Sequence, residues 1–347
     1  MSDEKNRQWV LKRRPEGLVS DDDFEWVSSP RPALQPDSAL IRTLYFSFDP
    51  TQRGWLNDAP GYMPPVQIGE TMRAAGIGQV VQSNRADLQP GDLVQGMLSW
   101  QDFVLISGKQ TWPLEKISTQ LPLTDRLSVY GLTGVTAYFG MLEVGAVRGG
   151  DVVVVSGAAG ATGSIAGQIA KIKGAACVIG IAGGADKCKW LVEKAGFDAA
   201  IDYRSEKIGA RLRALAPKGV DLFFDNVGGE ILDSVLLNLA YRARVVICGG
   251  ISSGYGVKIP PGPKHYMQLV FKSAKMEGFL LLTYQQRMSE AVEALQQWVE
   301  AGRIHFEVDV AEGLEKAPAA LRRLFEGRNF GKQLLKVSDP PLPTRAA

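Results

Sequence analysis

Hydrophobic and polar positions alternate along the chain in two different ways. From about residue 128 to residue 302, short apolar runs alternate with stretches whose apolar residues recur at helical spacing. This order is typical of a parallel sheet covered by helices on both faces. The runs predict six strands, at 152–155, 176–181, 199–202, 220–225, 244–248 and 276–282, with helices near 163–173, 187–195, 205–216, 230–239 and 288–301. We therefore expect a doubly wound α/β domain with a six-stranded parallel sheet.

The first part of the chain has a different pattern. Short alternating runs are separated there by turns rich in proline and glycine, such as PPVQIGE and QPGDLVQGML, which predict a small β-rich domain. The stretch FGKQLLKVSD near the end is again strand-like, and we expect it to return to that domain. A chain of 347 residues is long enough for about two domains, which we place at 1–127 with 303–347 and at 128–302.

A run of small residues joins the first strand of the α/β domain to its first helix. The sequence VVVVSGAAGATGSIAGQIAKIKG places Ala158, Gly160 and Gly163 at the key positions of a G-x-G-x-x-G dinucleotide fingerprint. These positions allow a tight turn, close approach of a pyrophosphate to the backbone, and close packing of helix on strand, with helix amides facing the phosphates. The alternative is a glycine-rich turn that only packs a helix on a sheet. The further βα units that follow favour the cofactor site.

The residues at the end of the second predicted strand indicate whether NAD or NADPH is the cofactor. An acidic residue there would bind the ribose 2′-hydroxyl of NAD, but the strand ends in IGIAGGADKCKW, with glycines at that place and Lys187 soon after. An ammonium group can hold a 2′-phosphate. The sequence therefore predicts NADPH. On charge alone, Lys187 is equally well explained as a solvated residue in the first turn of the next helix.

Composition narrows the class of partner. The 39 basic and 37 acidic residues form no dense run of one sign, so we expect a small-molecule partner and neither nucleic acid nor a membrane surface. Cys177, Cys188 and Cys248 form no CxxC pair, which argues against a disulfide framework or a thiolate metal cluster. No apolar run approaches the roughly 20 residues of a membrane span, and the N-terminus has no signal-peptide core. We expect a soluble cytoplasmic protein.

Several motifs together resemble the medium-chain reductase superfamily. They are LYFSFDPTQRGWL, GAAGATGSIAGQIAKIKG, FFDNVGG, ICGGISSGYG with IPPGP, and NFGKQLL, in family order over almost the whole chain. More narrowly, they resemble its zinc-free branch of NADPH-dependent alkenal/one oxidoreductases, which includes prostaglandin reductases, plant double-bond reductases and curcumin reductases. The resemblance implies a GroES-like substrate domain, a Rossmann domain inserted before its last segment, and a homodimer.

The ligands of both family zinc sites are missing. Zinc-dependent relatives carry a G-H-E motif whose histidine binds the catalytic metal, whereas this chain has Gly69-Glu70. The four cysteines of the structural zinc are also absent after GDLV, and His265 and His305 lie far from any cysteine pair. We therefore expect no zinc. Without a Lewis acid, a conjugated C=C bond is easier to reduce than an isolated carbonyl, because hydride addition gives an enolate whose charge is spread.

The resemblance implies a cofactor site when it is carried over residue by residue. Its members are Gly160, Ala161, Thr162 and Gly163 for the pyrophosphate, Lys187 and Tyr203 for the 2′-phosphate, Asn226, the turn Cys248, Gly249, Gly250, Ile251, Ser252 and Ser253, then Phe279, Leu280 and Leu281 beside the nicotinamide, and Asn329. Two of these have simple alternatives. Asn226 could cap the turn that follows it, and Phe279 could be an ordinary core residue.

The proton donor departs from the family pattern. Relatives often have SxDPYMR where this chain has SFDPTQR, so Thr51 replaces a tyrosine and Arg53 is kept. Relatives also place a tyrosine in an ISxYN turn, whereas ISSGYG puts Tyr255 one residue late. Tyr255 and Tyr62 are the candidate phenols that would reach an enolate oxygen. A phenol with a pKa near 10 donates a hydrogen bond while neutral.

The predicted function is NADPH-dependent reduction of the C=C bond of α,β-unsaturated aldehydes and ketones, with hydride transfer to the β-carbon and protonation of the enolate. A quinone reductase and a non-catalytic NADPH-binding protein are the alternatives. The segment YRSEK at 203–207 matches the Y-x-x-x-K of short-chain dehydrogenases, but it follows Gly163 too soon for the layout of that family.

Overall fold

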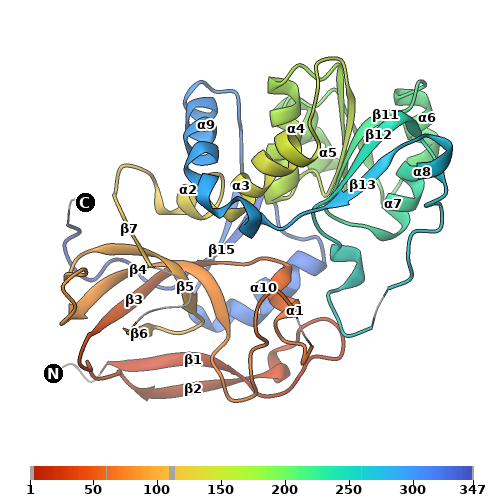
Figure 1. Cartoon of the computed structure of the whole chain (residues 1–347). Helices are drawn as coiled ribbons and strands as arrows, with labels where there is room; N and C mark the ends of the chain where they lie inside the picture. Colours follow the sequence, from red (N-terminus) through yellow and green to blue (C-terminus); the bar gives the residue numbers. More distant parts are fainter. Residues whose placement is uncertain (1–3, 60, 109–113, 259, 346–347) are drawn as a thin grey trace. The chain divides into compact units, whose positions relative to one another are not determined.

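The computed structural model describes residues 4–59, 61–108, 114–258 and 260–345, which fold into two units (Figure 1). One unit comprises the described residues of Met1–Leu127, Tyr255–Val257 and Val308–Ala347, and the other those of Ser128–Gly254 and Lys258–Glu307. Among these residues, no helix combines the length and the apolar character needed to cross a membrane.

The second unit is built on a parallel sheet, as the sequence predicts. Its strands are β8 (Val152–Ser156), β9 (Cys177–Ala182), β10 (Ala199–Asp202), β11 (Val220–Asp225), β12 (Leu239–Ile247) and β13 (Lys275–Gly278), in the order β10-β9-β8-β11-β12-β13. Every neighbouring pair is parallel. Val153, Val154 and Val155 are fully buried, because strands covered on both faces need continuous apolar runs. The fold class is confirmed.

The helices of this unit lie within a few residues of their predicted positions. They are α4 (Ala161–Ile172), α5 (Ala185–Glu193), α6 (Ile208–Leu215), α7 (Gly229–Leu236) and α9 (Met288–Glu300), with a short α8 (Gln268–Phe271). The sequence pattern did not predict α3 (Leu132–Phe139), which continues as a π-helical turn, Gly140–Val144. Its glycine and β-branched residues have low helix propensity, and its packing against α4 and α9 stabilises it instead.

The last strand prediction, 276–282, is wrong beyond Gly278. β13 ends there, and 3₁₀ turns occupy Leu281–Arg287. In the apolar run after β13, Leu280 and Leu282 are exposed and only Phe279 packs closely. The Phe279 ring packs where a Cβ on Gly140 would lie, 2.6 Å from that position, and contacts Tyr284 edge-on. The strand predicted at 244–248 is longer than expected, since β12 begins at Leu239.

The first unit is rich in strands, and its main sheet is largely antiparallel. The path runs β14 (Val308–Glu312), β15 (Lys332–Lys336), β3 (Ser38–Ser47), β4 (Arg73–Ser83), β5 (Leu93–Ser99) and β7 (Glu115–Ile117), with β6 (Phe103–Ser107) paired to β3. β1 (Lys5–Leu11) and β2 (Phe24–Pro30) form a separate pair, and α1 (Thr51–Gly54), α2 (Leu123–Leu127) and α10 (Ala317–Phe325) complete the unit. The strand predicted in FGKQLLKVSD is confirmed as β15, where Leu335 pairs with Phe46 of β3.

Candidate functional site

The loop between β8 and α4 has the geometry of a phosphate-binding turn. Gly157 adopts a φ of 57°, and Gly160 is the N-cap of α4 without a side-chain capping hydrogen bond. A Cβ on Gly163 would lie 2.4 Å from the Gly157 carbonyl oxygen, so only glycine lets the helix pack this closely on the turn. The first turn of α4 therefore presents backbone amides that no side chain caps, which is the arrangement that binds anions.

A second group of predicted residues lies at the ends of β9 and β10. Gly184, with a φ of 99°, precedes α5, and Lys187 lies half-buried in the first turn of that helix. The Tyr203 side chain covers Gly183 so closely that a Cβ there would lie 2.8 Å from two ring carbons and from the hydroxyl oxygen. The structure thus brings Tyr203 against the glycines that precede the Lys187 helix.

Arg204 belongs to the same cluster, although the sequence analysis did not single it out. Its guanidinium lies 5.9 Å from the centre of the Tyr203 ring, and its Nη1 lies 3.8 Å from the position of a Cβ on Gly184. No ion pair of Arg204 occurs among the described residues. The available signal was its place directly after Tyr203 in YRSEK. A guanidinium here suits a phosphate group.

The Asp202 carboxylate fixes the shape of this cluster. It accepts hydrogen bonds from the backbone amides of Gly184 (2.9 Å) and Arg204 (3.0 Å) and from the Ser205 hydroxyl (3.1 Å). These bonds, the one from Gly184 first, lower the pKa of Asp202. The loops after β9 and β10 are consequently held to each other.

The FFDNVGG loop after β11 is organised by a buried carboxylate. Asp225 is 0% exposed, and it accepts hydrogen bonds from the Ser156 hydroxyl (2.6 Å) and from the amides of Val227 and Gly228 (both 3.0 Å). Burial raises the pKa of Asp225, while the three hydrogen bonds act in the opposite direction. The Asn226 amide donates to the Ser156 carbonyl at 2.7 Å. Asn226 therefore ties the ends of β8 and β11 together.

The turn from Cys248 to Ser253 lies against the FFDNVGG loop. The amides of Cys248 and Gly249 donate to the Asp225 carbonyl, and the Ser252 hydroxyl donates to the Val227 carbonyl at 2.6 Å. Burial raises the pKa of the Cys248 thiol to about 12. The predicted residues of the β8, β11 and β12 ends thus form one connected loop cluster.

The remaining predicted residues belong to other segments of the chain. Phe279 packs partly as a core residue beside Gly140, and Leu280 is exposed. Asn329 belongs to the first unit, where its amide donates to the Gly331 carbonyl at 3.0 Å. Tyr62, 48% exposed, and Tyr255 also belong to the first unit. Nothing in the described residues forms a group of three or more His, Cys, Asp or Glu side chains able to hold a metal ion.

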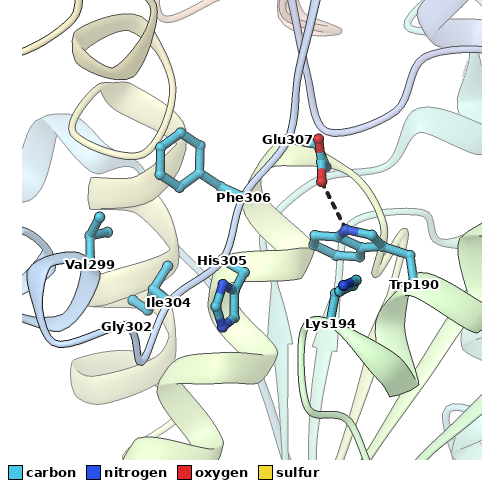
Figure 2. Close-up of a pocket in the computed structure, with 8 residues that line it drawn as sticks. All are labelled: Trp190, Lys194, Val299, Gly302, Ile304, His305, Phe306 and Glu307. Atoms are coloured by element: carbon cyan, nitrogen blue, oxygen red, sulfur yellow. Dashed lines mark hydrogen bonds between the residues drawn. The ribbon is translucent and has the colours of Figure 1, made fainter.

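Two cavities of the second unit contain none of the predicted site residues. The first, of about 390 Å³, is shown in Figure 2, where the Trp190 indole donates to the Glu307 carboxylate at 3.0 Å beside Lys194 and His305. The second, of about 380 Å³, is lined by Arg148, Arg242, Ala243, Arg244, Ser273 and Lys275. Neither cavity coincides with the loop cluster at the carboxyl ends of the strands.

Comparison with known proteins places these features in context. Residues 7–114 match the family model described as the N-terminal domain of oxidoreductase, and residues 161–297 match the one described as zinc-binding dehydrogenase. The NADPH-dependent curcumin reductase of Escherichia coli (strain K12) is 37% identical over 340 residues, covering 96% of this chain and 98% of that protein. The 2-alkenal reductase (NADP(+)-dependent) of Nicotiana tabacum is 36% identical over 339 residues, with coverages of 96% and 98%.

A solved structure agrees over the same length. The crystal structure of CurA in complex with NADPH from Vibrio vulnificus superposes with a TM-score of 0.89 at 37% identity. The match covers 96% of this chain and 100% of that one. Both units and the loop cluster therefore fall within the region of similarity.

Proposed function

The chain belongs to the medium-chain reductase family, in the branch of the curcumin and 2-alkenal reductases, and on that premise we propose that it reduces the C=C bond of α,β-unsaturated aldehydes and ketones with NADPH. The observation that carries the proposal is similarity over 96% of the chain to reductases with these names. The loop cluster described above supports the proposal, because its glycines and free helix amides suit a nucleotide.

The residues present fit the phosphates of NADPH. We assign the pyrophosphate to the turn Gly160, Ala161, Thr162 and Gly163. The helix amides of this turn have no side-chain cap, and a Cβ on Gly163 would clash with the backbone. We assign the 2′-phosphate to Lys187 and Tyr203 and add Arg204, whose guanidinium lies by the same glycines. Asp225 and Asn226 keep the adjoining loops in place.

The chemistry requires little from the protein beyond positioning and hydrogen-bond donation. When bound, NADPH supplies the hydride that adds to the β-carbon of the substrate. The resulting enolate carries its charge mainly on oxygen, where one or two donors can stabilise it while the α-carbon takes a proton from solvent. We assign the donor to the phenol of Tyr255, with Tyr62 as the second candidate.

Labelled products test the reaction class. With NADPH deuterated at the transferred position, the label is expected on the β-carbon of an enone, with the carbonyl intact. Tyr255→Phe is expected to lower turnover roughly 100-fold or more, as for a positioned donor to an oxyanion. Label on the carbonyl carbon would refute the reaction class. A panel of enals, enones and quinones tests the alternatives. Turnover of the quinones alone would favour a quinone reductase, and no turnover of any compound would favour a non-catalytic NADPH-binding protein.

We further propose a homodimer built on the edge of the parallel sheet. β13 pairs only with β12 among the described strands, so its outer edge is open. Apolar side chains are exposed in the adjoining segment, at Tyr266, Met267, Val270 and Phe271, the last of them 67% exposed. An open strand edge beside an apolar patch suits a second copy of the same chain. Light scattering of the wild-type chain and of Phe271→Asp tests this: a dimer is expected for the first and a monomer for the second.

A further inference from the structure

The first unit buries the guanidinium of Arg53, whose side chain is 1% exposed and forms no salt bridge among the residues that the structure describes. Its guanidinium instead donates to three neutral oxygens: the carbonyls of Gly17 and Pro15, both at 2.8 Å, and Asn57 Oδ1 at 2.6 Å. Burial lowers the pKa of Arg53. The Asp23 carboxylate attracts the guanidinium only at longer range, without a salt bridge. A buried charge whose direct hydrogen-bond acceptors are all neutral is costly, so a structural role alone explains it poorly.

Asn57 connects Arg53 to Tyr255 through two hydrogen bonds. Its amide nitrogen donates to the Tyr255 carbonyl at 2.8 Å, while its oxygen accepts from Arg53. The orientation of the amide is fixed by its two partners, because a guanidinium can only donate and a carbonyl can only accept. Arg53, Asn57 and the Tyr255 backbone therefore form one directed hydrogen-bond chain.

Tyr255 has a backbone conformation that needs such support. Its φ of 51° is in the left-handed region, which a tyrosine rarely adopts, and it follows Gly254 at a φ of 68°. Its ring contacts Phe325 edge-on, with centroids 6.5 Å apart. The ring also lies beside Gly54, where a Cβ would be in ordinary contact with Tyr255 Cδ1 at 4.0 Å. Strained residues of this kind persist only where their surroundings hold them, and they cluster at functional sites.

We propose that Arg53 and Asn57 are positioning residues that hold Tyr255 in the conformation from which its phenol serves the substrate oxygen. The inference rests on the proposed function, in which Tyr255 is the donor. Neither Arg53 nor Asn57 is assigned a contact with the substrate. Their effect passes through the Tyr255 carbonyl.

Asn57→Asp separates positioning from a merely structural role. The carboxylate keeps an acceptor for Arg53 and gives the buried guanidinium a counter-charge, but it has no N–H group for the Tyr255 carbonyl. Turnover of an enone is expected to fall about 10- to 100-fold, as for a displaced catalytic group, with the KM for NADPH and the melting temperature not lowered. Asn84→Asp is the matched control. Its exposed side chain uses only its oxygen, which accepts from the Ser38 amide, so turnover stays at the wild-type value.

Combination with Tyr255→Phe shows whether the effect passes through the phenol. Asn57→Asp should cause no further loss in the Tyr255→Phe background, because both changes remove the same contribution. An equal fractional loss in both backgrounds overturns the inference, as does wild-type turnover of Asn57→Asp. In both cases an impaired Tyr255→Phe leaves the proposed donor intact. An unimpaired Tyr255→Phe overturns the donor and the inference together.

Asn57→Ala repeats the test without a new charge. It removes both amide contacts, so the same fall in turnover and the same absence of a further loss beside Tyr255→Phe are expected. Wild-type turnover of this variant would again overturn the inference.

Discussion

Two glycine-to-alanine substitutions in helices of the same unit should have different effects on stability and on NADPH binding. At Gly163 in α4, an added Cβ would lie 2.4 Å from the Gly157 carbonyl oxygen and 2.9 Å from Ala158 Cα. Both atoms belong to the backbone, so the helix must move. At Gly209 in α6, the nearest atoms would lie 3.7 Å away, at the ends of the Arg213 and Asn238 side chains. That is ordinary contact, so Gly209→Ala is the matched control.

The magnitudes follow from two opposing contributions. Alanine gains about 1 kcal/mol of helix propensity over glycine, and forced overpacking costs about 1–3 kcal/mol. Gly209→Ala gains helix propensity without an overpacking cost, so its melting temperature should rise by roughly 2–4 °C. Gly163→Ala loses about as much as it gains or more, and the shift of α4 also displaces the amides that face the pyrophosphate.

Thermal unfolding and NADPH titration measure both consequences. We expect Gly163→Ala to bind NADPH at least about 10-fold more weakly than wild type, a loss of roughly 1.4 kcal/mol, and Gly209→Ala to bind it normally. If Gly163→Ala bound NADPH as tightly as wild type and melted at a higher temperature, the assignment of this turn to the cofactor would be wrong.

Three further predictions concern the cofactor, the metal and a thiol. Lys187→Ala and Arg204→Ala should each weaken the binding of NADPH by about 1–3 kcal/mol in fluorescence titrations and leave the binding of NADH nearly unchanged, since only NADPH carries the 2′-phosphate. Equal losses of binding for both cofactors would contradict the assignment. Elemental analysis should find no stoichiometric zinc, and chelators should leave turnover unchanged; one tightly bound zinc per chain would overturn the argument from the missing ligands. Burial raises the pKa of the Cys248 thiol to about 12, so this thiol should resist alkylation at pH 8 in the native protein and react after unfolding. The thiol ionises at lower pH in the unfolded chain than in the folded one. The contribution of Cys248 to the free energy of unfolding is therefore present below about pH 8.5 and is lost as the pH rises toward 12.

The sequence predicts the parallel sheet well because burial on both faces demands continuous apolar runs. Strands at 199–202 and 220–225 agree with β10 and β11 to the residue. The pattern fails where tertiary packing replaces propensity. The run at 279–282 does not continue the strand: Phe279 packs beside Gly140, whereas Leu280 and Leu282 are exposed. α3 is stabilised by its neighbours in spite of its glycine and β-branched residues.

In the candidate site, too, the sequence predicts some of the residues and not others. The pyrophosphate turn is predictable because glycine is the residue that sterics demand at Gly163. Arg204 is not predictable from spacing, because its place by Gly184 depends on how the loops after β9 and β10 meet. The hydrogen bond between Asn57 and Tyr255 joins residues 198 positions apart, and no local pattern in the sequence indicates it.

The segmented layout of the first unit has a consequence for folding during synthesis. Residues 308–347 supply β14, β15 and α10, and the Lys332 ammonium donates to the Phe48 carbonyl across a separation of 284 residues. β3 therefore cannot pair with β15 until the chain has been synthesised as far as Lys336. All strands of the parallel sheet lie earlier in the chain, so this sheet can assemble first. A truncation before β15 should leave a chain with one folded unit and an exposed strand edge, a form prone to aggregation.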